Sequence, residues 1–201
     1  MLFNSVEFMI FFPVVVLLYF ILPFKFRWAL LLVSSCIFYM FYNPANIFLM
    51  FFSIIINYLA VILLEKTDKQ SKKKMYLLIS LISSLGLLFL YKYFNFFNGL
   101  LGSIINFAGG NYSFSGLDLI LPMGISFYTF QTLSYTIDVY RGNCKAERHF
   151  GYFALYVTFF PQLVAGPIER SDRLLPQLHQ SHKFDYTRVV AGLRRMLWGF
   201  L

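Results

Sequence analysis

The sequence predicts an all-α, polytopic helical membrane protein, with about five transmembrane helices and one re-entrant segment. Hydrophobic residues make up 59% of the 201 positions and charged residues only 13%, whereas soluble domains carry roughly 25% charged residues. Phenylalanine alone occurs 26 times. A soluble fold of this length cannot bury so much apolar surface. We therefore expect residues 1–201 to form a single membrane domain, without a separate soluble domain.

Five apolar runs predict the transmembrane helices. The second run is short for a hydrocarbon core of roughly 30 Å, but Trp28 and Tyr42 at its ends are suited to the membrane interface. Pro44 disfavours helix in the turn that follows. Residues 99–116 are rich in Gly and Ser, and we expect an extracytoplasmic loop there, with room for a short surface helix. The predicted spans are about 6–24, 28–42, 47–64, 75–91 and 117–140.

The basic residues predict the orientation of these spans. The chain holds 17 Lys and Arg residues, and all of them except Lys92 follow the first, third or fifth span or the broken segment beyond it. The positive-inside rule makes that side cytoplasmic and places the N-terminus outside. The net charge of +8 is therefore explained by orientation signals, with lipid as the partner and no nucleic acid. The Lys-rich loop 66–74 has the alternative role of binding anionic lipid.

Cysteine and histidine give no sign of a metal centre, a disulfide or a bound cofactor. Cys36 lies in an apolar run and Cys144 in a basic loop, so the two thiols are not expected to pair. His149, His179 and His182 all lie in basic loops, and no cluster of carboxylates accompanies them. We therefore expect neither a metal site nor a general base for an alcohol acceptor among these histidines.

The fifth span carries a stripe of polar side chains. Gln131, Tyr135 and Asp138 are spaced four and three residues apart, which places them on one face of a helix. Polar groups in a membrane span are costly and often mark a functional path. We predict that this face lines the path of a substrate or an acyl chain. The alternative is interhelical hydrogen bonding, with Asp138 paired to Arg141.

The segment 151–165 is apolar but too short and too broken to cross a bilayer. Pro161 removes a backbone donor, and the pair Gly166–Pro167 disfavours further helix. A 15-residue helix spans roughly 22 Å, and both flanks are basic. These features predict a re-entrant element whose freed backbone groups, together with Gln162, bind a polar ligand. A surface hairpin is the alternative.

A charged run follows the broken segment directly. Glu169 and Arg170, with Asp172 and Arg173, are suited to hold the phosphates of a cytoplasmic donor or of a pantetheine carrier. The alternative is mutual pairing at the membrane edge. Farther on, residues 185–201 predict a helix capped by Asp185, and the sequence stops inside an apolar run, which we expect of an N-terminal piece of a longer protein.

Three stretches of sequence resemble the membrane-bound O-acyltransferase (MBOAT) family, in its bacterial alginate O-acetylation branch. They are MLFNSVEFMIFFPVV (1–15), PMGISFYTFQTLSYTIDVYRG (122–142) and FFPQLVAGPIER (159–170). The resemblance covers essentially the whole chain. It implies a helical bundle with a central funnel in the bacterial inner membrane.

The resemblance also implies an activity, which is transfer of an acyl group, here acetyl, from a cytoplasmic thioester donor to hydroxyls of an extracytoplasmic polysaccharide. Acetyl-CoA or an acyl carrier would be the co-substrate, and a periplasmic or extracellular acetyltransferase a further partner. The essential histidine of the family lies on a later segment, so no catalytic residue is expected within residues 1–201 and the piece alone should be inactive. The tunnel-lining candidates are Gln131, Tyr135, Asp138, Pro161, Gln162, Gly166, Pro167, Glu169 and Arg170.

Two further classes of function stay open on the residues alone. A transporter or flippase would use the broken segment as a half-helix binding site. A non-catalytic assembly subunit of a polysaccharide export system would need no reacting group at all.

Overall fold

The computed structural model describes residues 1, 3–112, 114, 116–163 and 166–200, and within these ranges it contains helices and no strand. The all-α prediction is therefore confirmed for the described part of the chain. In chain order the helices are α1 (Val6–Ile21), α2 (Phe24–Met40), α3 (Asn46–Lys66), α4 (Gln70–Leu88), the π-helix η1 (Phe89–Tyr93), α5 (Phe94–Phe107), α6 (Ile125–Arg141), α7 (Phe150–Thr158), α8 (Phe160–Leu163), α9 (Ser171–Leu178) and α10 (Tyr186–Phe200).

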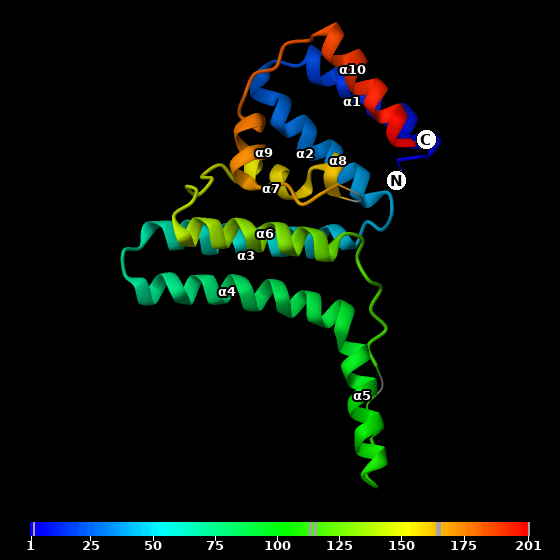
Figure 1. Cartoon of the computed structure of the whole chain (residues 1–201), viewed down its shortest axis with the longest axis vertical. Helices are drawn as coiled ribbons and strands as arrows, with labels where there is room; N and C mark the ends of the chain where they lie inside the picture. The colour runs from blue at the N-terminus through cyan, green and yellow to red at the C-terminus, as the bar shows by residue number, and fades with distance from the viewer. Residues whose placement is uncertain (2, 113, 115, 164–165, 201) are drawn as a thin grey trace.

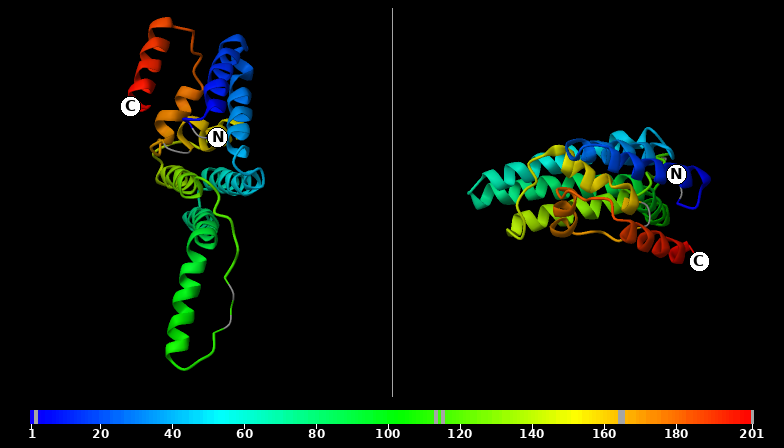
Figure 2. Two further views of the ribbon diagram at one scale, coloured as in Figure 1. Left: turned by 90° about the vertical axis from the view of Figure 1, so that its right-hand side faces the viewer. Right: turned by 90° about the horizontal axis from the view of Figure 1, so that it is seen from above.

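The helices stack in layers around α7. Helices α3 and α6 lie side by side, with α4 packed against both on one side (Figures 1 and 2). On the other side, α7 and α8 lie between this three-helix layer and the pair formed by α1 and α2. Helix α9 packs against α7, and α5 leaves the stack altogether. The short broken segment is therefore enclosed between two layers of longer helices.

Burial confirms that the broken segment is at the centre of the molecule. The five consecutive residues Phe153–Val157 of α7 are each 0% exposed. A helix that is apolar on all sides is stable only when other elements cover it completely. Here α2, α3, α6 and α9 provide that cover.

Two helices of the described residues are long and apolar enough to cross a membrane, namely Asn46–Lys66 and the continuous 38-residue run from Gln70 through η1 to Phe107. Val6–Ile21 is apolar but shorter. This is consistent with a helical membrane protein, while the number of five spans stays a prediction. The predicted spans at 6–24 and 47–64 correspond closely to α1 and α3.

Two helices begin at other residues than the predicted spans. The second span was expected from residue 28, but α2 begins at Phe24, directly after Pro23, whose fixed φ suits a helix start. The fifth was expected from residue 117, but α6 begins only at Ile125. Pro122 and Gly124 explain the delay, because Gly124 has a φ of +73° and cannot belong to a right-handed helix.

The chain after the predicted fourth span at 75–91 is more helical than expected, because only a short surface helix was expected within the loop 99–116. The helix continues past residue 91 as η1 and α5, and ends only at Phe107. In η1 the Phe94 amide donates to the Phe89 carbonyl, one residue farther back than in an α-helix. Wide turns of this kind bend helices, and Figure 1 shows α5 running crosswise to α4.

The broken segment consists of two short helices and a returning chain. It consists of α7 and α8 with a break at Phe159, and the chain beyond Gly166 runs back beside it to α9 (Figure 1). Residues 164–165 of the predicted range lie outside the described residues. The two ends of the hairpin lie on the same side of the molecule, as a re-entrant element requires, and its depth in a membrane stays a prediction.

Candidate functional site

The break between α7 and α8 frees backbone groups, and side chains from other helices bind them. In a continuous helix the Phe160 amide would donate to the Tyr156 carbonyl. It donates instead to Ser35 Oγ of α2, at 3.2 Å. The Tyr156 carbonyl accepts from Gln131 Nε2 at 2.8 Å and from Gln162 Nε2 at 3.0 Å. The break is therefore stabilised from both sides by buried polar side chains.

This arrangement changes the interpretation of Gln131 and Gln162. The sequence suggested that the freed backbone groups and Gln162 bind a polar ligand, but the Tyr156 carbonyl already has two donors. Three buried polar atoms of α6 and α7 have no partner among the described residues, namely Tyr128 Oη, Gln131 Oε1 and Thr158 Oγ1. Their residues are at most 1% exposed. Buried polar atoms of this kind are the ones that remain able to bind a water molecule or a polar ligand.

Two tyrosines connect the centre of the fold to the loops around it. Tyr135 Oη accepts from the Glu147 amide at 2.7 Å. Tyr156 Oη donates to the Glu169 carbonyl at 3.0 Å. The first bond ties α6 to the loop before α7, and the second ties α7 to the segment that returns from α8. Both residues hold the two ends of the broken segment in place.

Asp138 lies at the surface end of the polar stripe. The ion pair with Arg141, which was the alternative interpretation of Asp138, is not among the described ion pairs; Asp138 Oδ1 accepts from Asn143 Nδ2 at 3.1 Å instead. Gly142, with a φ of +79°, ends α6, and the Asn143 amide returns to the Asp138 carbonyl at 2.9 Å. This helix-ending turn places Asn143 beside the carboxylate. The alternative pairing of Glu169, Arg170, Asp172 and Arg173 with one another is likewise absent from the described ion pairs.

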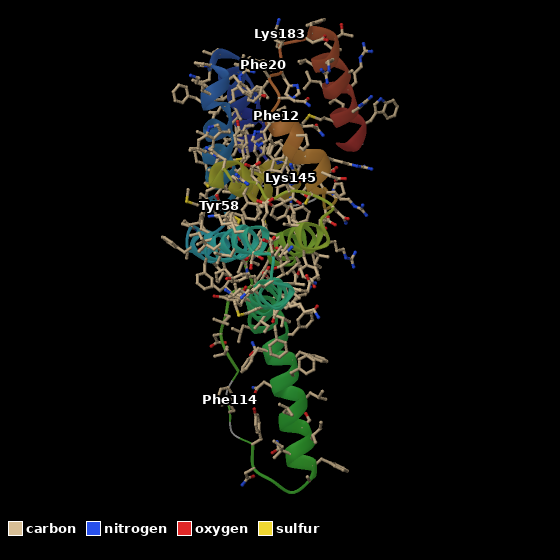
Figure 3. The ribbon with its side chains drawn as sticks, turned by 90° about the vertical axis from the view of Figure 1, so that its left-hand side faces the viewer. Phe12, Phe20, Tyr58, Phe114, Lys145 and Lys183 are labelled. Carbon is tan, nitrogen blue, oxygen red and sulfur yellow. The ribbon has the colours of Figure 1, made fainter. Side chains whose placement is uncertain are left out.

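A cavity of about 290 Å³ lies between α1 and α2 on one side and α7, α8 and α9 on the other. Its lining is mainly aromatic and aliphatic, and includes Phe12 and Phe20 of α1 and Phe159 and Pro161 at the break. Figure 3 shows Phe20 near the basic loop that carries Lys183, with Phe12 farther toward α7. The cavity therefore connects the break in the helix with a basic loop.

Arg27 is the charged residue of this cavity. Its Nη1 donates to the His182 carbonyl at 2.7 Å and its Nε to the Leu22 carbonyl at 3.1 Å. The guanidinium lies over the Tyr19 ring, 4.7 Å from the ring centre. These contacts fix the end of α1 to the loop before α10 and leave a positive charge at the cavity. The sequence pattern had marked Arg27 only as an orientation signal.

A second hollow, of about 640 Å³, lies on the opposite side of α6. It is an open groove between α4 and α6, and Asp138, Arg141, Asn143 and Arg170 contribute its polar groups. Its remaining lining comes from apolar residues such as Leu85 and from Ser134.

The nine predicted tunnel residues therefore fall into separate groups. Gln131, Tyr135 and Gln162 are buried between α6 and α7 and line neither hollow. Pro161 is exposed at the apolar cavity, whereas Asp138 and Arg170 lie at the open groove. The remaining three, Gly166, Pro167 and Glu169, lie on the segment that returns to α9. A single passage lined by all nine stays a prediction.

The histidines have structural partners. His149 begins α7, where its Nδ1 accepts from the Tyr152 amide at 3.3 Å. His179 Nε2 lies 2.7 Å from Glu147 Oε2, and its ring stacks on Tyr152. His182 Nε2 lies 3.2 Å from the Gln177 carbonyl. No group of three or more potential metal ligands is found in the described ranges.

One buried polar cluster was missed from the sequence. Asn57 of α3 is 0% exposed, and its Nδ2 donates to Ser84 Oγ of α4 at 2.9 Å. Its Oδ1 accepts from Ser80 Oγ, and this hydroxyl oxygen lies 3.3 Å from Thr136 Oγ1 of α6. The cluster joins the three helices of one layer. A repeat of polar residues four apart on both helices, 53 and 57 on α3 and 80 and 84 on α4, was the available signal.

The fold and its buried polar contacts are those expected of a helical membrane protein. No family model matches the chain and no solved structure matches it. Curated relatives do match over its whole length. A probable alginate O-acetylase AlgI of Azotobacter vinelandii is 33% identical over 204 residues, which cover 100% of this chain and 40% of the relative.

Relatives from two other organisms agree with this. The probable alginate O-acetylase AlgI of Pseudomonas aeruginosa is 33% identical, covering 100% of this chain and 39% of the relative. A peptidoglycan O-acetyltransferase of Helicobacter pylori is 32% identical over 228 residues, covering 96% of this chain and 42% of the relative. The chain thus spans about two fifths of the length of these relatives. The resemblance is confirmed: over essentially its whole length the chain is related to these O-acetylases, which are members of the membrane-bound O-acyltransferase family.

Proposed function

We propose that the intact protein is an O-acyltransferase that moves an acetyl group from a cytoplasmic thioester donor to hydroxyls of an extracytoplasmic polysaccharide. The observation that carries this proposal is the similarity, over the whole chain, to relatives named for O-acetylation of two different glycan polymers. Acetyl-CoA or an acyl carrier is the co-substrate, and a periplasmic or extracellular acetyltransferase is a further partner. The catalytic histidine lies outside residues 1–201.

The proposed topology is multi-pass in the bacterial inner membrane, with the N-terminus outside. The arrangement of the helices supports it. The basic stretches 66–74 and 141–148 lie at the same end of the three-helix layer, because α3 ends, α4 begins and α6 ends there (Figure 1). Such clustering is what the positive-inside rule requires of the cytoplasmic end.

The proposed entry of the donor is the basic, cytoplasmic end of the molecule. The apolar cavity reaches from the loop after α9 to the break at Phe159, and Arg27 supplies a positive charge suited to a phosphate. The buried hydrogen bonds from Gln131 and Gln162 to the Tyr156 carbonyl stabilise the interruption between α7 and α8. We assign these residues a positioning role, since none of them presents a nucleophile or a base to the cavity.

An assay of the intact protein, reconstituted in liposomes, tests the function. The donor is acetyl-CoA or an acetylated carrier, and the acceptor is alginate or peptidoglycan. We expect release of free thiol that depends on the polymer, together with acetyl esters on the polymer detected by mass spectrometry. Absence of both products with every pair of donor and acceptor would refute the proposal. Heat-treated protein is the control.

A labelling experiment tests the topology separately. Single cysteines placed just before Phe150 and just after Arg170 should both react with a membrane-impermeant reagent from the cytoplasmic side. Labelling of the two positions from opposite sides would show that α7 and α8 cross the membrane and that the re-entrant interpretation is wrong.

A further inference from the structure

Helix α5 and the chain that returns from it form a projection, which we call the α5 arm (residues 94–112, 114 and 116–118 as described). It extends away from the layers and contacts them only at its base (Figures 1 and 2). The arm is fully helical on its outward course and extended on its return. Its two halves hold each other through side chains of α5.

One face of α5 uses all of its polar groups to bind the returning chain. Asn95 Oδ1 accepts from the Leu117 amide and Asn95 Nδ2 donates to the Leu117 carbonyl, both at 2.8 Å. Asn98 Nδ2 donates to the Phe114 carbonyl at 3.3 Å. Gly102 lets the Tyr112 ring approach closely, because a Cβ there would lie 3.0 Å from Tyr112 Cδ1. This face is closed by the chain itself.

The other face of α5 is apolar and exposed. Leu100 is 47% exposed, Ile104 56% and Phe107 95%. Helical spacing of three and four residues places them on the side of α5 opposite Asn95 and Asn98. No Asp, Glu, Lys, Arg or His occurs between residues 94 and 117. A surface that is both exposed and free of charge over such a length is suited to hydrocarbon rather than to water.

The position of the arm matches that environment. It starts at the end of the three-helix layer opposite the Lys-rich loop 66–74, and it runs crosswise to α3, α4 and α6 (Figure 1). If those helices follow the membrane normal, α5 lies along the membrane plane. Lys92, at the base of the arm, donates to Ser126 Oγ at 3.3 Å and is exposed at that same end. The exposed apolar surface of α4, including Ile82, continues onto α5.

We propose that the α5 arm is an interfacial anchor that lies flat in the leaflet opposite the basic loops. Its occupant is lipid, at the boundary of headgroups and acyl chains, where an in-plane amphipathic helix buries its apolar face. Because residues 94–117 carry no charged side chain, binding of the arm needs no anionic headgroup and does not weaken with salt. The inference does not depend on the acyltransferase function.

Spin labelling of the intact protein in nanodiscs of zwitterionic lipid tests the proposal. Single cysteines are placed at Leu100 and Ile104 on the apolar face, in a background without other cysteines. Ile82 on α4 provides the reference inside the bilayer and Lys72 the reference in water. The accessibility of each label to oxygen and to a water-soluble nickel chelate then gives its depth.

We expect Leu100 and Ile104 to have several-fold higher oxygen-to-nickel accessibility ratios than Lys72, at a depth shallower than Ile82. The ratios should not change when the salt concentration is raised. Nickel accessibility equal to that of Lys72 would place the arm in water and overturn the proposal. Exclusion of both reagents would also overturn it, because another protein surface would then cover this face.

Discussion

The two glutamines at the break in α7–α8 give the sharpest test of the structure. Gln131 and Gln162 both donate to the Tyr156 carbonyl, at 2.8 and 3.0 Å. Replacing either glutamine by methionine keeps the approximate volume of the side chain, and the Tyr156 carbonyl still accepts from the other glutamine. Replacing both leaves a buried carbonyl with no donor, because the Phe160 amide is bound to Ser35. The structure therefore predicts that the two substitutions are not additive.

The magnitudes follow from hydrogen-bond energetics. Loss of one bond with the second retained costs about 1 kcal/mol. Gln131→Met should cost less than Gln162→Met, because Gln131 Oε1 has no partner among the described residues and its removal relieves that penalty. The double variant loses both bonds and leaves a desolvated carbonyl, which adds about 1–3 kcal/mol. We expect about 3–5 kcal/mol for the double variant and a coupling energy of about 1–3 kcal/mol.

Unfolding of the purified protein by SDS in mixed micelles measures these energies. Fluorescence of Trp28, which contacts Tyr152 of α7 at 5.9 Å between ring centres, reports the packing around the break. Gln180→Met on the exposed surface is the matched control and should change stability by less than about 0.5 kcal/mol. If the double variant loses no more unfolding free energy than the two single variants together, the shared carbonyl does not contribute the predicted coupling.

Three substitutions and one alkylation experiment test other parts of the fold. Gly151→Ala should lower the unfolding free energy by about 1–3 kcal/mol, because a Cβ would lie 2.2 Å from the Trp28 ring. Gly86→Ala is its control, since a Cβ added there would have no atom within 4 Å. It should be neutral or stabilise by up to about 1 kcal/mol in the same unfolding assay. Asn57→Leu should cost about 2 kcal/mol in unfolding free energy, and no loss would refute the polar cluster. Burial raises the pKa of the Cys144 thiol, so its thiolate fraction at neutral pH is small. Alkylation at this residue, followed by mass spectrometry, should reach half its maximal rate at a higher pH than a small-molecule thiol does; an equal or lower pH would contradict the burial.

Much of the fold could be predicted from local sequence signals. Apolar runs predicted α1 and α3, Asp185 predicted the start of α10, and its Oδ1 does accept from the Arg188 amide at 3.2 Å. Pro161 and the short apolar run predicted the broken segment. These features depend on residues close together in the chain, so that propensity and capping rules apply to them.

The difference between the start of the predicted fifth span and the start of α6 depends on backbone geometry rather than on hydropathy. Residues 117–121 are apolar except for Asp118 and extend the pattern of α6, but the left-handed Gly124 prevents helix before Ile125. The sequence allowed only a short surface helix within 99–116, because glycines and asparagines are typical of loops, whereas α5 runs from Phe94 to Phe107. Tertiary contacts override that preference, since Asn95 and Asn98 bind the returning chain.

The candidate site depends on partners that are distant in the sequence. Gln131 was correctly singled out as an expensive polar residue on α6, but nothing local indicates that its partner is a carbonyl 25 residues away. Ser35 lies 125 residues from the amide that it accepts from, and no pattern within α2 indicates that role. Pairings of this kind follow only from the stacking of α2, α6 and α7.

The cluster around Asn57 has a consequence for how the chain is made. Asn57 finds donors and acceptors on Ser53, Ser80 and Ser84, all of them within α3 and α4. The three residues between these helices allow them to pair as an antiparallel hairpin as soon as both leave the ribosome. The side-chain amide of Asn57 is then already hydrogen-bonded when that hairpin enters the bilayer. Helix α6 packs against the hairpin later, and its Thr136 then contacts the Ser80 hydroxyl.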